Sequence, residues 1–346
     1  MNKHFLYEMI QTASPSGKEF ELQKKIMSYM QDTVDGFETD TTGNVMSILN
    51  KDHDFKVLLA GHVDEIGMMI TMITSDGLAK VTNVGGIRPA LYLGQKVRIL
   101  TKNGIIGGVV GYNNDLLKNK SLETKDLFID LGATSKEEAL KVIAPGDYVV
   151  ADTDYLELLN NNLAGRALDN RLGAFIVIEA LRRAKELGTR VGVYSATTVD
   201  EETTMRGAVW AAKRVKPALA LIVDVTFATD YPGTNPEVTG EIKLGGGPVL
   251  CHGSIINNHL NDALINIANR LNMPIQFEMA PGRTGTDGDR IHFQNDGVPL
   301  ALISIPLRYM HSGSEVCHLN DVEQIIELIA HFLAELQPCF NLSPYA

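Results

Sequence analysis

Two patterns of hydrophobic and polar residues divide this chain. At its beginning and from about residue 169 onward, segments with apolar residues at helical spacing alternate with short, continuous apolar runs. Between residues 66 and 154 the apolar runs are short, closely spaced and interrupted by glycine. Alternating helices and strands are typical of a layered α/β domain, and closely spaced short strands are typical of a small barrel or sandwich. The pattern therefore predicts an α/β domain with a β-rich insertion.

The elements of the α/β domain can be placed from this spacing. Residues 16–33 form a predicted amphipathic helix, in which Ser16 is the N-cap and Glu19 follows three residues later. A second helical pattern covers residues 172–187 and stops at Gly188. The remaining predicted strands are 45–49, 56–63, 191–196, 219–224 and 299–305, and the remaining predicted helices are 205–215, 260–271 and 322–336.

The insertion differs from the rest of the chain because it consists mainly of short strand-like runs. Its strand-like runs are residues 68–73, 78–84, 96–100, 105–110, 127–131 and 148–151. We expect residues 1–65 and 155–346 to form one α/β domain with a mixed central sheet flanked by helices. Residues 66–154 would form a barrel-like insertion, used either for contacts between subunits or as a lid.

Residues of the kind that bind metal ions stand next to the ends of the apolar runs. In an open α/β sheet, ligands collect beyond the carboxyl ends of the strands, so side chains placed there are expected to meet. Four strand ends and the start of one helix contribute to this set. The candidate metal ligands are His62, Asp169, Glu202, Asp224 and His311, and the further candidate site residues are Asp64 and Glu201.

This set suits a centre for two divalent ions. Two imidazoles and three carboxylates are ligands that Zn²⁺, Co²⁺ or Mn²⁺ accept, and one carboxylate could bridge both ions. Asp64, two residues after His62 on an extended segment, could accept the free ring N–H of His62 and orient it. Of Glu201 and Glu202, one would bind metal and the other would act as general base. Residue chemistry alone leaves their order open.

The amino-acid composition is that of a globular protein, and the charge argues against some classes of partner. Of the 346 residues, 45% are hydrophobic and 21% are charged, which is ordinary for a globular protein. The formal net charge of -11 argues against a nucleic-acid or anionic-membrane partner, since both would repel the chain. We find no signal-peptide pattern and no apolar run near the roughly twenty residues of a membrane span. Three cysteines without Cys-x-x-Cys spacing fit a reducing cytoplasm.

Glycine-rich residues 245–248 lack the Lys-Ser/Thr pair of a phosphate-binding loop, so no nucleotide cofactor is expected. Two other residues allow alternatives. Arg308 could meet a substrate carboxylate or pair with a structural acid. Asp287, at a predicted helix start, could shape the site or merely complement the helix dipole.

Several motifs together resemble the TET, or glutamyl-aminopeptidase-like, family of dinuclear metallo-aminopeptidases. The resemblance covers essentially the whole chain, including the insertion. The motifs are Gly-His-Val-Asp-Glu-Ile-Gly at 61–67, Leu-Asp-Asn-Arg at 168–171, Asp-Glu-Glu at 200–202, the segment 224–230, Gly-Thr-Asp at 285–287 and the segment 305–312. Their order and spacing match the family as well as their residue types.

The resemblance implies roles for individual residues. Asp169 would bridge the two ions. His62 and Asp224 would be the other ligands of one ion, and Glu202 and His311 would be the other ligands of the second. Glu201 would be the general base and Asp64 would orient His62. It further implies a cytoplasmic aminopeptidase with two divalent ions per subunit, zinc or cobalt being favoured. Short peptides would be its substrates, and it would assemble into a hollow homododecamer.

The sequence leaves other functions open. The same two-metal chemistry could serve a deacylase or carboxypeptidase that acts on another amide, because a fold does not fix its substrate. A non-catalytic scaffold is the third possible function, and the complete ligand set argues against it.

The chain departs from the family pattern at the glutamate pair. Asp200 stands where the family usually has Gln, and Thr203-Thr204 replace an aliphatic residue and Gly. The added charge of Asp200 could raise the pKa of Glu201 or alter metal preference.

Overall fold

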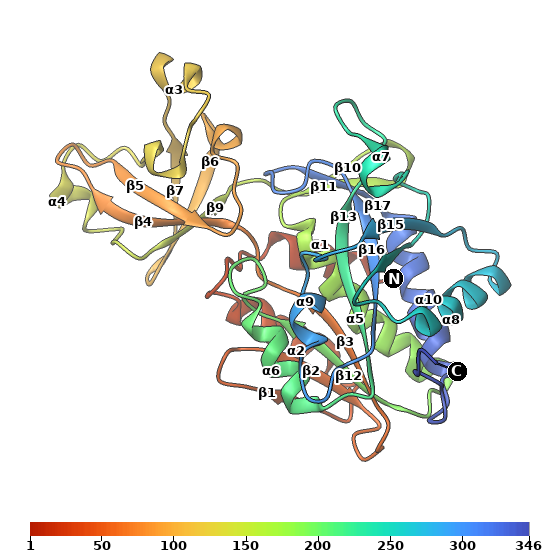
Figure 1. Ribbon diagram of the computed structural model, residues 1–346. Helices are drawn as coiled ribbons and strands as arrows, with labels where there is room; N and C mark the ends of the chain where they lie inside the picture. The colour runs from red at the N-terminus through yellow and green to blue at the C-terminus, as the bar shows by residue number, and fades with distance from the viewer. Residues whose placement is uncertain (346) are drawn as a thin grey trace.

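A mixed eight-stranded sheet forms the centre of the larger domain in the computed structural model, which describes residues 1–345 (Figure 1). Strands β12, β3, β13 and β16 run parallel to one another, and antiparallel strands flank them. In spatial order the strands are β1 (Gly36–Thr39), β2 (Val45–Leu49), β12 (Gly192–Thr198), β3 (Lys56–His62), β13 (Leu219–Phe227), β16 (Leu300–Leu307), β14 (Val249–Gly253) and β15 (Gln276–Ala280).

Helices cover both faces of this sheet, because its central strands are apolar on both sides. In β3, Val57 and Leu59 join the core on one face, whereas Leu58 and Ala60 join the core on the other. The first face carries α1 (Lys3–Gln11), α2 (Phe20–Met30), α5 (Leu168–Leu187), α8 (Asn258–Arg270) and α10 (Leu319–Glu335). The second face carries α6 (Arg206–Val215) and α9 (Gly288–Ile291), and the short α7 (Pro236–Thr239) follows β13.

A closed barrel projects from this layered domain, at the upper left of Figure 1. Its neighbouring strands are β4 (Gly67–Ile73), β5 (Ala79–Val84), β8 (Phe128–Asp130), β7 (Gly104–Val110), β6 (Lys96–Thr101) and β9 (Tyr148–Ala151). The barrel has its own core, which includes Ile70, Val81 and Ile99. Two short helices, α3 (Asn114–Lys118) and α4 (Lys136–Ala139), lie in its connections.

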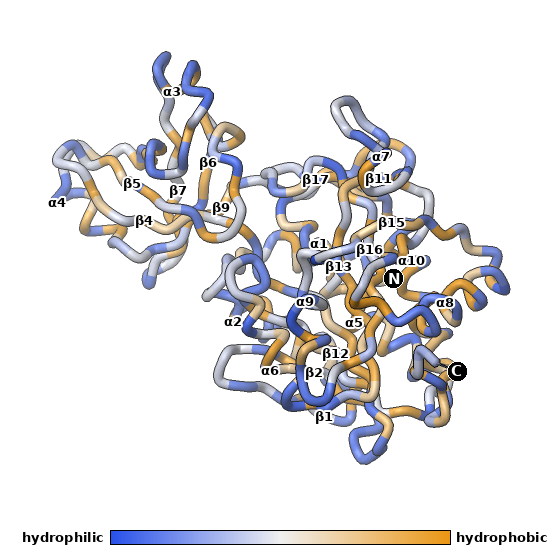
Figure 2. The backbone as a smooth tube through the Cα atoms, viewed as in Figure 1, coloured by the Kyte–Doolittle hydropathy of each residue, from blue (hydrophilic) through white to orange (hydrophobic). Residues whose placement is uncertain are grey.

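A small third sheet pairs the segment that follows the barrel with residues 315–318. It consists of β10 (Leu156–Glu157), β11 (Asn162–Gly165) and β17 (Glu315–His318). Figure 2 shows that apolar segments follow the central strands and the helices packed on them, whereas the loops are hydrophilic. Within residues 1–345, no helix has both the length and the apolar character needed to cross a membrane.

The predicted fold class is confirmed, but some local expectations were wrong. The helix assigned to residues 16–33 begins at Phe20, and Ser16 does not cap it. The Ser16 hydroxyl instead donates a hydrogen bond to Asp64 at 2.7 Å. Strand β13 continues three residues past Asp224 to Phe227. Helix α1 and strands β1, β14 and β15 were not predicted, although α1 buries Phe5, Leu6, Met9 and Ile10 at helical spacing.

Candidate metal and catalytic centre

The parallel strands bring most of the candidate residues to one edge of the sheet. His62 is the last residue of β3 and lies beside Thr198, the last residue of β12. The chain then turns and presents Glu201 and Glu202 at the same edge. Asp224 lies on β13, where its register partner is Ser304 of β16. Because parallel strands end together, residues far apart in the sequence become neighbours here.

The imidazole of His62 is surrounded by carboxylates. Its Nε2 atom lies 3.3 Å from Oδ1 of Asp169, 3.7 Å from Oε2 of Glu201 and 3.9 Å from Oδ1 of Asp224. Asp169 comes from the first turn of α5, where its backbone is not helical. One imidazole nitrogen and three carboxylates therefore face a common space.

A second imidazole approaches the other oxygen of Asp169. Nε2 of His311 lies 3.3 Å from Oδ2 of Asp169 and 3.6 Å from Oε2 of Glu202. The two oxygens of Asp169 thus face different imidazoles, as a carboxylate that bridges two ions would require. His62, Asp169 and Glu202 also each offer a ligand atom within 4.8 Å of the others.

Asp64 lies beneath this cluster and is fully buried. Its Oδ1 lies 3.3 Å from Nδ1 of His62 and accepts the backbone N–H of Glu201 at 3.0 Å. Its Oδ2 accepts the backbone N–H of Glu202 at 3.1 Å and the Ser16 hydroxyl at 2.7 Å. Asp64 therefore contacts His62, as expected, and also holds the turn that carries both glutamates.

Burial of so many acids shifts their protonation. Burial raises the pKa of Glu201 well above its usual range, and Asp224 adds to the shift although His62 opposes it. Burial likewise raises the pKa of Glu202 and of Asp224, with a contribution from the charge of Asp169 in each case. If all of these carboxyl groups were ionised, they would carry more negative charge than the nearby groups balance.

Asp169 behaves differently from its neighbours. Burial opposes its ionisation, but hydrogen bonds from His311 and His62 outweigh burial and lower the pKa of Asp169. Burial likewise opposes protonation of His62, yet hydrogen bonds to Asp169 and Asp64 raise the pKa of His62 well above its usual value. Asp169 is thus more readily ionised than Glu201, Glu202 and Asp224.

The donor set fits divalent cations. Five carboxyl groups surround two imidazoles, so the imidazoles alone cannot balance the carboxylate charge even when both are protonated. The Oε1 atom of Glu201 is buried and has no hydrogen-bond partner among residues 1–345. Buried charge of this kind requires compensation, and cations bound between the carboxylates and neutral imidazoles would supply it.

The structure shows the partners of three nearby residues whose roles the sequence left open. Asp200 forms an ion pair with Arg206, so the charge added by this departure from the family pattern has a partner. Arg308 pairs with Asp230 through two hydrogen bonds of 2.8 and 2.7 Å, which is the structural alternative. Asp287 makes no capping hydrogen bond to α9 within the described chain and instead accepts the Thr198 hydroxyl at 2.5 Å.

Two contacts at the site were missed from the sequence. Ser16 was assigned to a helix cap, and Glu315 was not considered, although it lies four residues after His311. Glu315 is 2% exposed, and burial raises the pKa of its carboxyl group well above its usual range. An acid four residues after a candidate ligand histidine was the one available signal.

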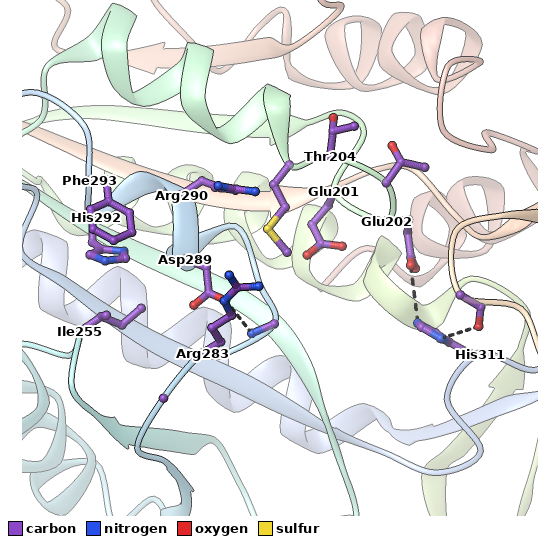
Figure 3. Close-up of a pocket in the computed structure, with 15 residues that line it drawn as sticks. Glu201, Glu202, Thr204, Ile255, Arg283, Asp289, Arg290, His292, Phe293 and His311 are labelled. Carbon is purple, nitrogen blue, oxygen red and sulfur yellow. Dashed lines mark hydrogen bonds and ion pairs between the residues drawn. The ribbon is translucent and has the colours of Figure 1, made fainter.

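A pocket of about 520 Å³ adjoins the cluster (Figure 3). Glu201, Glu202 and His311 line one end, and Figure 3 shows His292 and Phe293 at the other. Between these ends lie two exposed arginines and one acid of the wall, namely Arg283, Arg290 and Asp289. The pocket therefore leads from the candidate metal centre along a partly cationic wall.

Comparison with known proteins places this arrangement among peptidases. The family model described as M42 glutamyl aminopeptidase matches residues 43–328. The lysyl aminopeptidase of Pyrococcus furiosus is 32% identical over 344 residues, covering 96% of each chain.

Solved structures agree with this placement. A TET aminopeptidase from a marine-sediment Thaumarchaeota archaeon superposes with a TM-score of 0.92 at 33% identity, covering 97% of this chain and 96% of that one. The TET1 peptidase of Pyrococcus horikoshii, described as able to assemble into a tetrahedron or a large octahedral shell, gives a TM-score of 0.85. It is 32% identical and covers 96% of this chain and 99% of its own.

Proposed function

This chain belongs to the M42 glutamyl aminopeptidase family, and from that premise we propose that it removes N-terminal residues from peptides by two-metal hydrolysis. The resemblance seen in the sequence is thereby confirmed at the level of the family and of aminopeptidase activity. The observation that carries the dinuclear proposal is the position of Asp169, whose two oxygens each lie 3.3 Å from a different imidazole.

We assign the ligands of the two ions from these contacts. Asp169 would bridge both ions. His62 and Asp224 would be the other ligands of one ion, and Glu202 and His311 would be the other ligands of the second. Nitrogen and carboxylate ligands of this kind favour Zn²⁺ or Co²⁺. When bound, two such ions would lower the pKa of a water molecule and polarise the peptide carbonyl that the water attacks.

Glu201 is the proposed general base. It borders the common space around His62 and keeps one buried oxygen without a partner among residues 1–345. That oxygen can take the proton of the attacking water and return it to the amine that leaves. Burial raises the pKa of Glu201 above its usual range, the direction that makes its carboxylate a stronger proton acceptor. Asp64 would act as a positioning residue for His62 and the glutamate turn.

The pocket wall suggests a preference for acidic N-terminal residues. The carboxylate of Asp289 is engaged by its own loop, since it accepts N–H and hydroxyl hydrogen bonds from Thr284 and an N–H from Gly285. Arg283 and Arg290 extend from exposed positions on the same wall. A substrate carboxylate placed between the guanidinium groups would form charge-assisted hydrogen bonds.

We further propose a cytoplasmic homododecamer in which the barrel helps to make contacts between subunits. The support is a TET1 structure described as a dodecamer, 32% identical to this chain, together with a barrel that contributes no ligand to the proposed ion centre. Several apolar side chains on the barrel surface are strongly exposed, among them Met72, Ile105 and Tyr112. A contact between subunits at the barrel would remove side chains of this kind from water.

One assay separates this proposal from its alternatives. Aminoacyl chromophores with acidic, basic and apolar residues are tested beside N-acetylated peptides, with Zn²⁺, Co²⁺ or Mn²⁺ added. An aminopeptidase cleaves substrates with a free amine and leaves acetylated peptides intact. Release of the acetyl group, or cleavage from the carboxyl end, would support a deacylase or a carboxypeptidase instead. Failure on every substrate with each metal would support the scaffold reading.

A further inference from the structure

Glu315 links two of the proposed metal ligands through their backbones. Its Oε1 accepts the backbone N–H of His311 at 2.8 Å, and its Oε2 accepts the backbone N–H of Asp169 at 3.0 Å. Residues 169 and 315 are separated by 146 positions, so this single carboxylate joins two distant segments at the place where the side chains of Asp169 and His311 meet.

The backbone conformations at Asp169 and at His311 both depend on contacts from outside their own segments. Asp169 lies in a non-helical first turn of α5, so its N–H depends on a partner from outside the helix. His311 has a φ of 63°, in the left-handed region that non-glycine residues avoid, and Tyr309 has a φ of 60°. Such conformations persist when surrounding contacts fix them.

The loop that carries His311 is closed by the strand that carries Glu315. Arg308 and Val316 exchange backbone hydrogen bonds of 2.9 and 3.0 Å, which closes the loop at its base. Glu315 begins β17 and pairs with Gly165 of β11, three residues before Leu168. Its side chain therefore projects from a paired strand, and it is 2% exposed.

We propose that Glu315 is a positioning residue that sets the affinity of the ion bound between Asp169 and His311. This inference rests on the proposed dinuclear centre. Glu315 does for Asp169 and His311 what Asp64 does for Glu201 and Glu202, because each carboxylate accepts the backbone N–H groups of two site residues, one on each oxygen. Together the two carboxylates fix four of the proposed site residues.

The E315Q variant tests this role with little change in shape. A carboxamide keeps one acceptor oxygen and replaces the other with an NH₂ group, which would face a backbone N–H donor. One of the two ligand backbones therefore loses its restraint. E278Q is the matched control, because Glu278 is also a buried glutamate (9% exposed) and accepts the Ser304 hydroxyl at 2.7 Å on β16.

The readout is Co²⁺ titration of the full-length protein, followed by visible absorption, with thermal unfolding of the metal-free protein measured in parallel. We expect two ions per chain in wild type and in E278Q. In E315Q, one of the two ions should lose about 10–100-fold in affinity, the range typical for groups that orient metal ligands. E315Q with wild-type affinity for both ions, and only a lower unfolding temperature, would overturn the inference.

Other outcomes also decide the question. If wild type binds fewer than two Co²⁺ ions per chain, the dinuclear proposal fails and this inference fails with it. If wild type binds two and E315Q binds both equally well, the inference alone fails. Should E315Q not fold, E315D keeps two acceptor oxygens but withdraws them by one methylene, and the same titration applies. If neither variant folds with excess Co²⁺, Glu315 is purely structural and the inference is wrong.

Discussion

The backbone N–H of Glu201 donates a hydrogen bond to Oδ1 of Asp64 at 3.0 Å, across 137 positions of sequence. The same oxygen lies 3.3 Å from Nδ1 of His62. The proposed general base and a proposed metal ligand are therefore held by one buried carboxylate. Their relative positions are fixed before any substrate arrives, which is the preorganisation that catalysis at such a site requires.

The bridging role of Asp169 can be tested by removing its charge. D169N presents one carbonyl oxygen and one NH₂ group to the two ions, so it should bind them poorly. We expect elemental analysis to give about two ions per wild-type chain and fewer in D169N, with activity lost in proportion. Full activity in wild-type protein stripped to less than one ion per chain would contradict a dinuclear centre.

The two adjacent glutamates should respond differently to the same change. E201Q removes the proposed base and should lower kcat by about 10²–10⁴-fold while metal content stays near wild type. E202Q removes a proposed ligand and should lower metal content. Kinetics and elemental analysis on the same preparations make the comparison, and the opposite pattern would reverse the assignment of the pair.

The arginines of the pocket wall should control which N-terminal residue is preferred. R283Q removes one guanidinium charge that would meet a substrate carboxylate. We expect kcat/KM for a glutamyl substrate to fall by about tenfold or more relative to a leucyl substrate, in line with the 1.5–3 kcal/mol of a charge-assisted hydrogen bond. R190Q, at an exposed arginine outside this pocket, is the control. Equal losses on both substrates would contradict the assignment.

The buried charges around Glu65 should contribute strongly to stability. Glu65 is 3% exposed, pairs with Arg166 and accepts a 3.0 Å hydrogen bond from Arg171. E65A would leave two buried guanidinium groups without their carboxylate and should cost about 3–5 kcal/mol of unfolding free energy.

The matched control for this change is an ion pair on the surface. E21A breaks the exposed pair between Glu21 and Lys24, at 2.8 Å, and should change stability by less than about 1 kcal/mol. Urea unfolding of both variants makes the measurement. Similar midpoints for the two variants would show that the buried cluster contributes little.

Assembly should limit the size of substrates. Light scattering is expected to show a particle near twelve times the 37.8 kDa chain mass. If its active sites face an inner chamber, short peptides should be cleaved and folded proteins should survive whatever their terminal residue. Replacing exposed barrel residues Met72 and Ile105 with lysine should weaken the assembly. A fully active monomer that degrades folded proteins would refute this proposal without affecting the metal chemistry.

The sequence alone determined the layered α/β class, the barrel strands and the set of candidate ligands. The helices follow from apolar positions that recur every 3.6 residues, and the central strands from continuous apolar runs, because both faces of those strands are buried. His62 could be found in this way, since it ends an apolar run at the edge of the parallel sheet. Asp224 was also found as the polar end of an apolar run, although β13 continues three residues beyond it. The sequence identified Glu201 and Glu202 as site residues, but only the family resemblance indicated that Glu201 is the base and Glu202 the metal ligand.

Tertiary structure alone decided which groups support those residues. Ser16 bonds to Asp64 rather than capping a helix, Arg308 pairs with Asp230, and Glu315 joins Asp169 to His311. Two of these contacts, those of Ser16 and Arg308, were open to other readings from the sequence. Each depends on how separate elements pack, because the partner of a buried polar group is set by which donor or acceptor lies within about 3 Å after folding. Local patterning specifies which side chains are buried, and packing specifies which of them meet.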